Sequence, residues 1–149
     1  MSFKLWLEAN SLRLYHGSRR KFPKGFRLTP QPTGYAHHPD QQILEQVFEK
    51  MRPPDKLSRY QSVFLVDDPT DCESAGGYED HVYLVQPEGQ VEKSDLAWYS
   101  ECEVYLDEPI ERQQECAKNY WVGVPFTNPA NSMFEYRCRA AIILKEIRI

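Results

Sequence analysis

The residues of this sequence that could do chemistry are one histidine, one carboxylate and two aromatic rings, spread far apart along the chain. His16 stands at the end of a predicted strand, and Glu135 stands at the start of a late one. Phe64 lies in an apolar run, and Tyr78 follows a pair of glycines. A carboxylate stabilises positive charge that develops on a sugar as a bond to it breaks, and an aromatic wall favours a flat cation. Together, these side chains would suit the cleavage of a bond between a sugar and a cationic ring.

Each of these residues also has an ordinary structural explanation. His16 would then be a hydrogen-bonded histidine at a strand end, and Phe64 would be a core residue. Tyr78 would be a surface ring, and Glu135 an exposed carboxylate beside an arginine of its own strand, where an ion pair contributes little. The two explanations differ in whether the four side chains meet in the fold.

Several standard catalytic motifs are absent from the sequence, which has no G-x-x-x-x-G-K-[ST], G-x-G-x-x-G, H-E-x-x-H or G-x-S-x-G. His37-His38 is a weak metal candidate, because adjacent residues point to different sides and no partner stands at a suitable spacing. The four cysteines have no C-x-x-C spacing and no histidine at metal-finger spacing. We therefore expect no metal site and four free thiols.

Composition and charge are typical of one globular domain over residues 1–149. Hydrophobic residues make up 41% of the chain and charged residues 27%, which argues against disorder. The net charge of −4 disfavours general binding to a phosphate backbone, and we interpret the basic stretch Arg19-Arg20-Lys21, with Lys24, as a solvated loop. With no signal peptide and no membrane-length apolar stretch in view, the expected location is the cytoplasm.

Patterning predicts the elements that must position these residues. The expected helices are 3–9 with Ser2 as its N-cap, 40–51, 111–121 and a short one after Asp67-Asp68-Pro69. The expected strands are 12–16, 62–66, 81–85, 134–139 and 140–149, with a turn at 87–89 and loops at 19–38 and 125–132. About five to seven strands interrupted by two or three helices indicate an α+β fold rather than a regular β-α-β alternation.

Two of the predicted helices carry an apolar face at spacings near 3.6 residues. In 40–51 this face consists of Ile43, Leu44, Val47, Phe48 and Met51. In 111–121 it consists of Cys116, Ala117, Tyr120 and Trp121. We expect both faces to pack in a core.

The order of the segments resembles the ADP-ribosyltransferase superfamily, in the branch whose His-Tyr-Glu signature is shared with diphtheria toxin and the poly-ADP-ribose polymerases. That branch has a strand with His-Gly, a strand of the form aromatic-Phe-x-x-Asp, a helix ending in a second Tyr, and a Glu at the head of a late strand. The matching segments are Tyr15-His16-Gly17-Ser18, 62–69 with Tyr78, and Phe134-Glu135-Tyr136. Arg27-Leu28-Thr29-Pro30 and Asp95-Leu96-Ala97-Trp98 also look like small phage and bacterial members, so the resemblance covers most of the chain.

The resemblance implies a split pair of mostly antiparallel sheets that holds NAD in the cleft between its halves. His16 would hydrogen-bond a ribose hydroxyl of NAD. The backbone of Gly17 would bond the nicotinamide carboxamide, and a side chain at this position would block the approach. Ser18 ends the same strand and would belong to the same binding segment.

The remaining matched positions would enclose the reacting end of NAD. Tyr78 matches the second ring of the family, and Phe64 stands where the family usually has Tyr, so that the two would flank the nicotinamide. The change to Phe keeps the stacking face but removes a hydroxyl. Glu135 would bond the 2′-hydroxyl of the nicotinamide ribose.

The implied activity is transfer of ADP-ribose from NAD to a macromolecular acceptor, with release of nicotinamide. The resemblance favours a protein acceptor, and the segment 3–8, similar to the start of small phage proteins, suggests a host factor. Alternatives within the fold are an NAD glycohydrolase and an RNA 2′-phosphotransferase, which would need a basic cradle that the net charge disfavours. A non-catalytic binding or inhibitor protein is the alternative that Phe64 favours.

Overall fold

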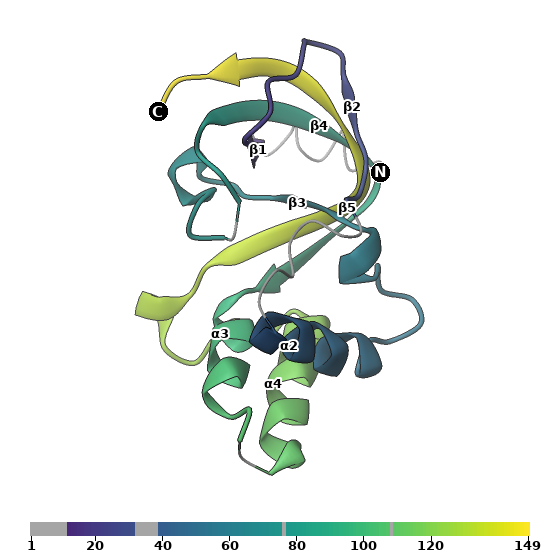
Figure 1. Cartoon of the computed structure of the whole chain (residues 1–149), viewed down its shortest axis with the longest axis vertical. Helices are drawn as coiled ribbons and strands as arrows, with labels where there is room; N and C mark the ends of the chain where they lie inside the picture. Colours follow the sequence, from purple (N-terminus) through teal and green to yellow (C-terminus); the bar gives the residue numbers. More distant parts are fainter. Residues whose placement is uncertain (1–11, 32–38, 76, 108) are drawn as a thin grey trace.

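The computed structural model describes residues 12–31, 39–75, 77–107 and 109–149 (Figure 1). The expected helix 3–9 with its cap at Ser2, and His37-His38, lie outside these residues. Within the described ranges the strands are β1 (Leu14–Ser18), β2 (Arg27–Leu28), β3 (Val63–Leu65), β4 (His81–Asp95) and β5 (Phe134–Ile147). The α-helices are α2 (Pro39–Lys50), α3 (Ala97–Val104) and α4 (Ile110–Val122), and the 3-10 helices are η1 (Arg59–Gln61), η2 (Pro69–Asp71) and η3 (Pro129–Asn131). The α+β class is confirmed.

The long strands β4 and β5 are the centre of one antiparallel sheet. Its order is β1-β4-β5-β2, and β3 pairs with β5 as well. Tyr15 in β1 also exchanges two backbone hydrogen bonds, of 2.8 and 3.0 Å, with Val66 just after β3. The circuit β1-β4-β5-β3 therefore closes on itself, and Figure 1 shows β4 and β5 curving around its interior.

The predicted turn at 87–89 is wrong, because the chain continues through it as β4. The pairing with β5 shifts register between Glu88 and Val91, and Gly89 takes a φ of 71°. A β-bulge needs the same left-handed glycine as many turns, and the long partner strand β5 decides between them. β1 begins opposite Val85 and pairs from there toward His81, so Pro87 lies where this side of β4 has a free edge and its missing N–H is tolerated. The two strands predicted at 134–139 and 140–149 are likewise one strand, β5.

The buried apolar residues form two large cores and a small one, which consists of Val66, Cys72 and Val82. The first fills the curl of the sheet and includes Leu14, Leu65, Tyr83, Cys138 and Ile143. The second lies among the helices, which Figure 1 shows gathered at one end of the sheet. The apolar face predicted for 111–121 is confirmed, since all four of its residues are buried in α4. In α2, Leu44 and Phe48 are fully buried, but Ile43 is 47% exposed and does not belong to the buried face.

Asp95, at the end of β4, organises the entry into α3 and the loop before β5. Its carboxylate accepts hydrogen bonds from the backbone N–H of Ala97 at 3.0 Å, Phe126 at 2.9 Å and Met133 at 3.0 Å, and from the hydroxyl of Ser132. Burial alone would raise the pKa of Asp95, but these hydrogen bonds outweigh it and lower the pKa below its ordinary value. The carboxylate is therefore a structural anion that fixes α3 beside the sheet.

We expect Asp95→Asn to reduce the free energy of unfolding at neutral pH by about 2–4 kcal/mol, because asparagine offers one acceptor oxygen and turns its NH2 toward donors. A lowered folded-state pKa gives stability that is complete above the ordinary pKa of 3.8 and is lost as pH falls through the folded-state pKa. Urea unfolding at about pH 7 and about pH 3 should therefore show a smaller gap between wild type and variant at the lower pH. The exposed Asp107, changed to Asn, is the control. An equal gap at both values would contradict this role.

Candidate functional site

A cavity of about 980 Å³ brings together all six residues that the sequence nominated. They are His16, Gly17, Ser18, Phe64, Tyr78 and Glu135. The remaining lining comes from further residues of β1, β2 and β3, from α2, η1, α3 and η3, and from the loops between these elements. This volume is near the upper end for small-molecule sites and is large enough for a dinucleotide.

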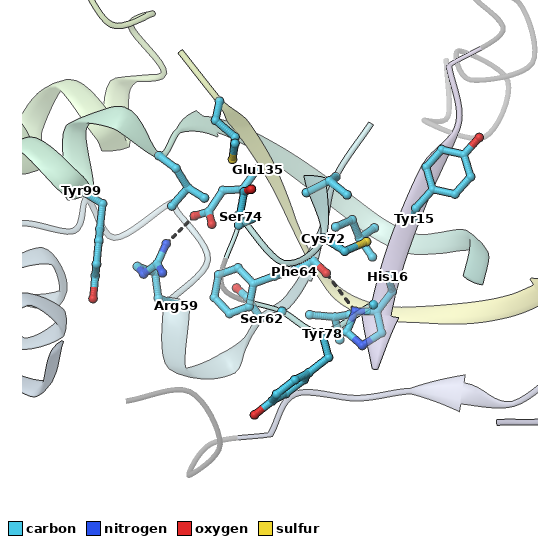
Figure 2. Close-up of a pocket in the computed structure, with 18 of the residues that line it drawn as sticks. Tyr15, His16, Arg59, Ser62, Phe64, Cys72, Ser74, Tyr78, Tyr99 and Glu135 are labelled. Carbon is cyan, nitrogen blue, oxygen red and sulfur yellow. Dashed lines mark hydrogen bonds and ion pairs between the residues drawn. The ribbon is translucent and has the colours of Figure 1, made fainter. Parts of the chain in front are cut away.

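His16 lies on β1 with its ring directed toward β3 (Figure 2). Its Nδ1 is 3.0 Å from the backbone carbonyl oxygen of Phe64. Because a carbonyl only accepts, Nδ1 carries the hydrogen, and Nε2 is left as an acceptor. Desolvation lowers the pKa of His16 below 6.5, so the ring is neutral at pH 7. The ordinary explanation, a hydrogen-bonded histidine at a strand end, is correct as far as Nδ1 goes, but the ring also lines the cavity.

Gly17 has its backbone polar groups on the side of β1 that faces away from β4. Tyr15 directs its N–H and C=O to Val66, and these groups alternate along a strand, so those of Gly17 face the same side as those of Tyr15. A Cβ on Gly17 would lie 2.0 Å from the carbonyl oxygen of Tyr78 and 2.8 Å from Cβ of Cys72. A side chain at position 17 would therefore meet Tyr78 and Cys72, and the predicted bond from the Gly17 backbone to the carboxamide stays a prediction. A substitution here would test packing as well as binding.

Tyr78 lies at the exposed rim of the cavity, whereas Ser18 lines the cavity from a buried position. Tyr78 is 39% exposed, and the guanidinium of Arg19 lies 5.0 Å from the centre of its ring. The hydroxyl of Ser18 accepts a hydrogen bond from the backbone N–H of Arg20 at 2.9 Å, which fixes the start of the following loop. Two arginines thus stand at the edge of the cavity, next to the strand that carries His16.

Glu135 is fully buried at the inner wall of the cavity, so the alternative of an exposed strand carboxylate is wrong. Its Oε1 accepts hydrogen bonds from Nη1 of Arg59 and from the hydroxyl of Tyr120. Its arginine partner therefore comes from η1 rather than from its own strand. Among the described residues no donor reaches Oε2, which leaves one oxygen of the carboxylate for a ligand.

Arg59 is the functional residue that sequence reasoning missed. Its Nε donates to both carboxylate oxygens of Glu45, at 3.1 and 3.0 Å, while Nη1 bonds Glu135. The guanidinium lies 4.8–5.4 Å from the ring centres of Phe64, Tyr99 and Tyr120. Burial would lower the pKa of Arg59, but its neighbours Glu135, then Tyr120 and Glu45, raise the pKa well above its ordinary value. One cation between two carboxylates leaves a net charge of −1 at this wall. Figure 2 shows the pair that Arg59 forms with Glu135.

The loop before Arg59 is held by two buried charges on the sheet. The N–H of Leu57 donates to Oε1 of Glu92 in β4, and its carbonyl accepts from Nη1 of Arg137 in β5 at 2.8 Å. Glu92 and Arg137 are directly opposite each other across the two strands. Ser58 caps η1 by accepting from the N–H of Tyr60 at 3.2 Å. This backbone clamp positions the guanidinium two residues further on.

The sequence held one signal for this cluster. Glu45 lies next to Leu44 and three residues before Phe48, within the apolar face of α2. A carboxylate on a buried helix face requires a partner, since acidic residues are almost never fully buried unpaired. Nothing in the sequence indicated that the partner would be Arg59, because the pair follows no spacing rule.

The cysteines supply no nucleophile to this site. All four are buried and free of disulfide bonds, as expected. Cys72 lines the cavity, but desolvation raises its pKa to about 11, so it is a neutral thiol at pH 7. Within the described ranges no group of three His, Cys, Asp or Glu side chains is arranged to hold a metal ion. None of the described helices is both long enough and apolar enough to cross a membrane.

Comparison of the sequence with models of known protein families finds no match, and a search of curated proteins finds none either. The chemistry of the cavity is therefore the basis on which a function is assigned.

We expect the ring of His16 to titrate below pH 6.5 in an NMR pH titration, with His81, which is partly exposed beside Glu146, as the comparison within the same spectra. Because the folded-state pKa is lowered, the contribution of neutral His16 to stability is complete above pH 6.5 and is lost as pH falls through the folded-state pKa. His16→Gln identifies the resonance. A measured pKa at or above 6.5 would contradict the desolvated, Nδ1-protonated ring.

Proposed function

We propose that this protein is an ADP-ribosyltransferase that cleaves NAD and transfers ADP-ribose to a macromolecular acceptor. The observation that carries the proposal is Glu135, a buried carboxylate with a free Oε2 at the wall of a large cavity that also holds His16 and Phe64. The fold of this superfamily, with the sheet divided into two halves beside the cleft, is part of the proposal. The bulge that divides β4 between Glu88 and Val91 supports it.

The charge at the inner wall suits the reaction. When the bond from nicotinamide to ribose breaks, positive charge passes to C1′ of the sugar and its ring oxygen. Arg59, Glu45 and Glu135 together carry −1, and this charge lies in a buried setting where electrostatic interactions are stronger than in water. A fixed negative charge that faces the sugar stabilises the transition state more than the ground state.

The other lining residues match the remaining parts of NAD. The unprotonated Nε2 of His16 is an acceptor for a ribose hydroxyl, and Phe64 offers a flat wall to the nicotinamide ring. Oε2 of Glu135 is the acceptor for the 2′-hydroxyl of the same ribose. Arg19 and Arg20 at the rim are suited to the diphosphate, which guanidinium groups bind through paired hydrogen bonds.

The reaction then needs only these groups. The bond from C1′ to the nicotinamide nitrogen breaks, and its electron pair leaves with neutral nicotinamide. Glu135 stabilises the sugar cation until an oxygen or nitrogen of the acceptor bonds C1′ and releases a proton to solvent.

A non-catalytic NAD-binding protein is the second candidate, and two observations favour it. Phe64 lacks the hydroxyl that the family usually has at this position, and Arg59 together with Tyr120 occupies Oε1 of Glu135. Such a protein would use the cavity to hold NAD without breaking it.

We expect NAD to bind in calorimetry and nicotinamide to be released when a cell lysate supplies the acceptor. Release that needs lysate indicates a transferase, whereas release without it indicates a glycohydrolase. Binding without release under either condition would support the non-catalytic alternative. An absence of binding at millimolar NAD would remove the basis of the proposal.

We expect Glu135→Gln to reduce turnover about a hundredfold or more, because one preorganised electrostatic group typically contributes roughly 2.7–4 kcal/mol in the transition state. NAD affinity should change little, since glutamine keeps an acceptor for Arg59 and Tyr120 while Glu45 still pairs with Arg59. The measurement is nicotinamide release together with calorimetric affinity on the same variant.

Glu88→Gln is the matched control, because Glu88 is a carboxylate of the same sheet that pairs with Arg27 at the surface and does not line the cavity. Its turnover should stay near that of wild type. Equal losses in the two variants would indicate a purely structural role for Glu135, and unchanged turnover in Glu135→Gln would remove it from the reaction.

A further inference from the structure

A basic groove adjoins the cavity, and the proposed NAD site makes no use of it. The groove measures about 430 Å³, and its cations are Lys21, Lys24, Lys145 and Arg148. Phe22 lines both the groove and the cavity, so the two are neighbours on the surface. Lys21 and Lys24, which the sequence suggested to be part of a solvated loop, lie together with Lys145 and Arg148 from the other end of the chain.

Backbone pairing brings the two ends of the chain together here. The N–H of Gly25 bonds the carbonyl of Ile143 at 2.8 Å, and the N–H of Ile143 bonds the carbonyl of Phe26 at 2.9 Å. The loop after β1 thus runs back along β5, as Figure 1 shows, and places Lys24 beside the strand that carries Lys145. The groove contains one carboxylate, Glu146, which lies 3.3 Å from His81.

The groove therefore has four cations to one anion in a protein whose net charge is −4. A local field of this kind attracts anionic partners whatever the overall charge of the molecule. This surface is therefore suited to a nucleic-acid partner although the net charge of the protein is negative.

An aromatic pair, the half-buried Phe22 and the exposed Phe26, lies where the groove meets the cavity, since Phe22 lines both and Phe26 lines the cavity. Phe22 and Phe26 stack with their ring centres 4.6 Å apart, and Phe26 is 41% exposed. The guanidinium of Arg20 lies 5.5 Å from the centre of the Phe22 ring. Cations that follow a phosphate backbone, beside rings on which bases stack, are the features by which proteins hold single-stranded nucleic acid.

We infer that this basic and aromatic surface binds single-stranded nucleic acid and presents it to the cavity as the acceptor of ADP-ribose. The second part of this inference rests on the proposed function. An acidic protein segment would match the cations of the groove, but it would offer no base to stack on the exposed part of Phe26. A duplex would keep its bases stacked inside and could not use the ring.

The transfer step is the same as for any nucleophile. The C1′–nitrogen bond of NAD breaks and its electron pair leaves with nicotinamide. A base nitrogen or a hydroxyl oxygen of the strand bonds C1′ and loses one proton to solvent, so no further reactant is required.

The binding part is tested without NAD. Fluorescence anisotropy would follow the full chain binding to a fluorescein-labelled single strand of about 15 nucleotides, as DNA and as RNA. Replacing Lys24 and Lys145 together by Gln should weaken binding about tenfold or more and reduce the slope of log affinity against log salt by about 1.4, since each lost phosphate contact contributes about 0.7. The same pair of changes at Lys50 and Lys118, exposed on α2 and α4, is the control and should leave both quantities unchanged.

Phe26→Ser separates stacking from charge. It should weaken binding about fivefold or more without changing the salt slope, because a stacked ring contributes to affinity but releases no counterions. Equal affinity of wild type and the Lys24 and Lys145 variant would overturn the inference. Competition by polyglutamate as strong as by an oligonucleotide would assign the groove to an acidic protein and overturn it as well.

The acceptor part is tested with NAD labelled on its adenine ring. Label should enter the oligonucleotide with the wild type and enter it about tenfold less with the Lys24 and Lys145 variant. Nicotinamide release measured without any oligonucleotide should be the same for both, because neither lysine lines the NAD cavity. Release with no label in the bound strand would overturn the acceptor role alone. Strand binding with no nicotinamide release under any condition would instead refute the proposed function, and the acceptor role with it, while the binding surface stands.

Discussion

The buried guanidinium of Arg59 is the interaction on which the rest of the structure depends. Glu45 comes from α2, Tyr99 from α3, Tyr120 from α4 and Glu135 from β5, and Arg59 contacts all four. Removing Arg59 would leave two buried carboxylates without a counter-charge, and an uncompensated buried charge typically costs about 3–5 kcal/mol. The cluster thus fixes where the helices stand relative to the sheet, and with it the shape of the cavity between them.

The same contacts set the chemical character of the cavity. A carboxylate that is to stabilise a sugar cation must be held in one orientation, because preorganised charge needs no rearrangement as the transition state forms. Arg59 and Tyr120 hold Glu135 by Oε1 and leave Oε2 toward the cavity. Arg59 also offsets part of that negative charge, and Glu45 restores the balance to −1. Orientation and charge would therefore be supplied by different members of one cluster.

Local patterning predicted which residues form helices and strands better than it predicted where one strand continues into the next predicted segment. The apolar stripe of α4 follows from spacing alone, whereas the residues at 87–89 suit a turn and a bulge equally well, and only the partner strand β5 decides between them. The residues of the candidate site also differ in whether the sequence could predict them. His16 and Glu135 could be nominated from the order of segments, but Arg59 and Glu45 are joined across elements without any motif. Tyr78 and Cys72 leave no room for a side chain at Gly17, and this contact between distant parts of the chain follows from no local pattern.

The distribution of charge links the two proposals. The overall charge of −4 conceals a local separation of charge. The inner wall of the cavity is acidic, whereas the rim carries arginines and the groove carries lysines. NAD carries its cation on the nicotinamide and its anions on the diphosphate, so a field that is negative inside and positive outside favours entry with the nicotinamide first. A polyanionic strand would be attracted to the rim by the same field and kept from the acidic wall. Substrate and acceptor could then occupy adjoining surfaces without competing, which is the arrangement that transfer rather than hydrolysis requires.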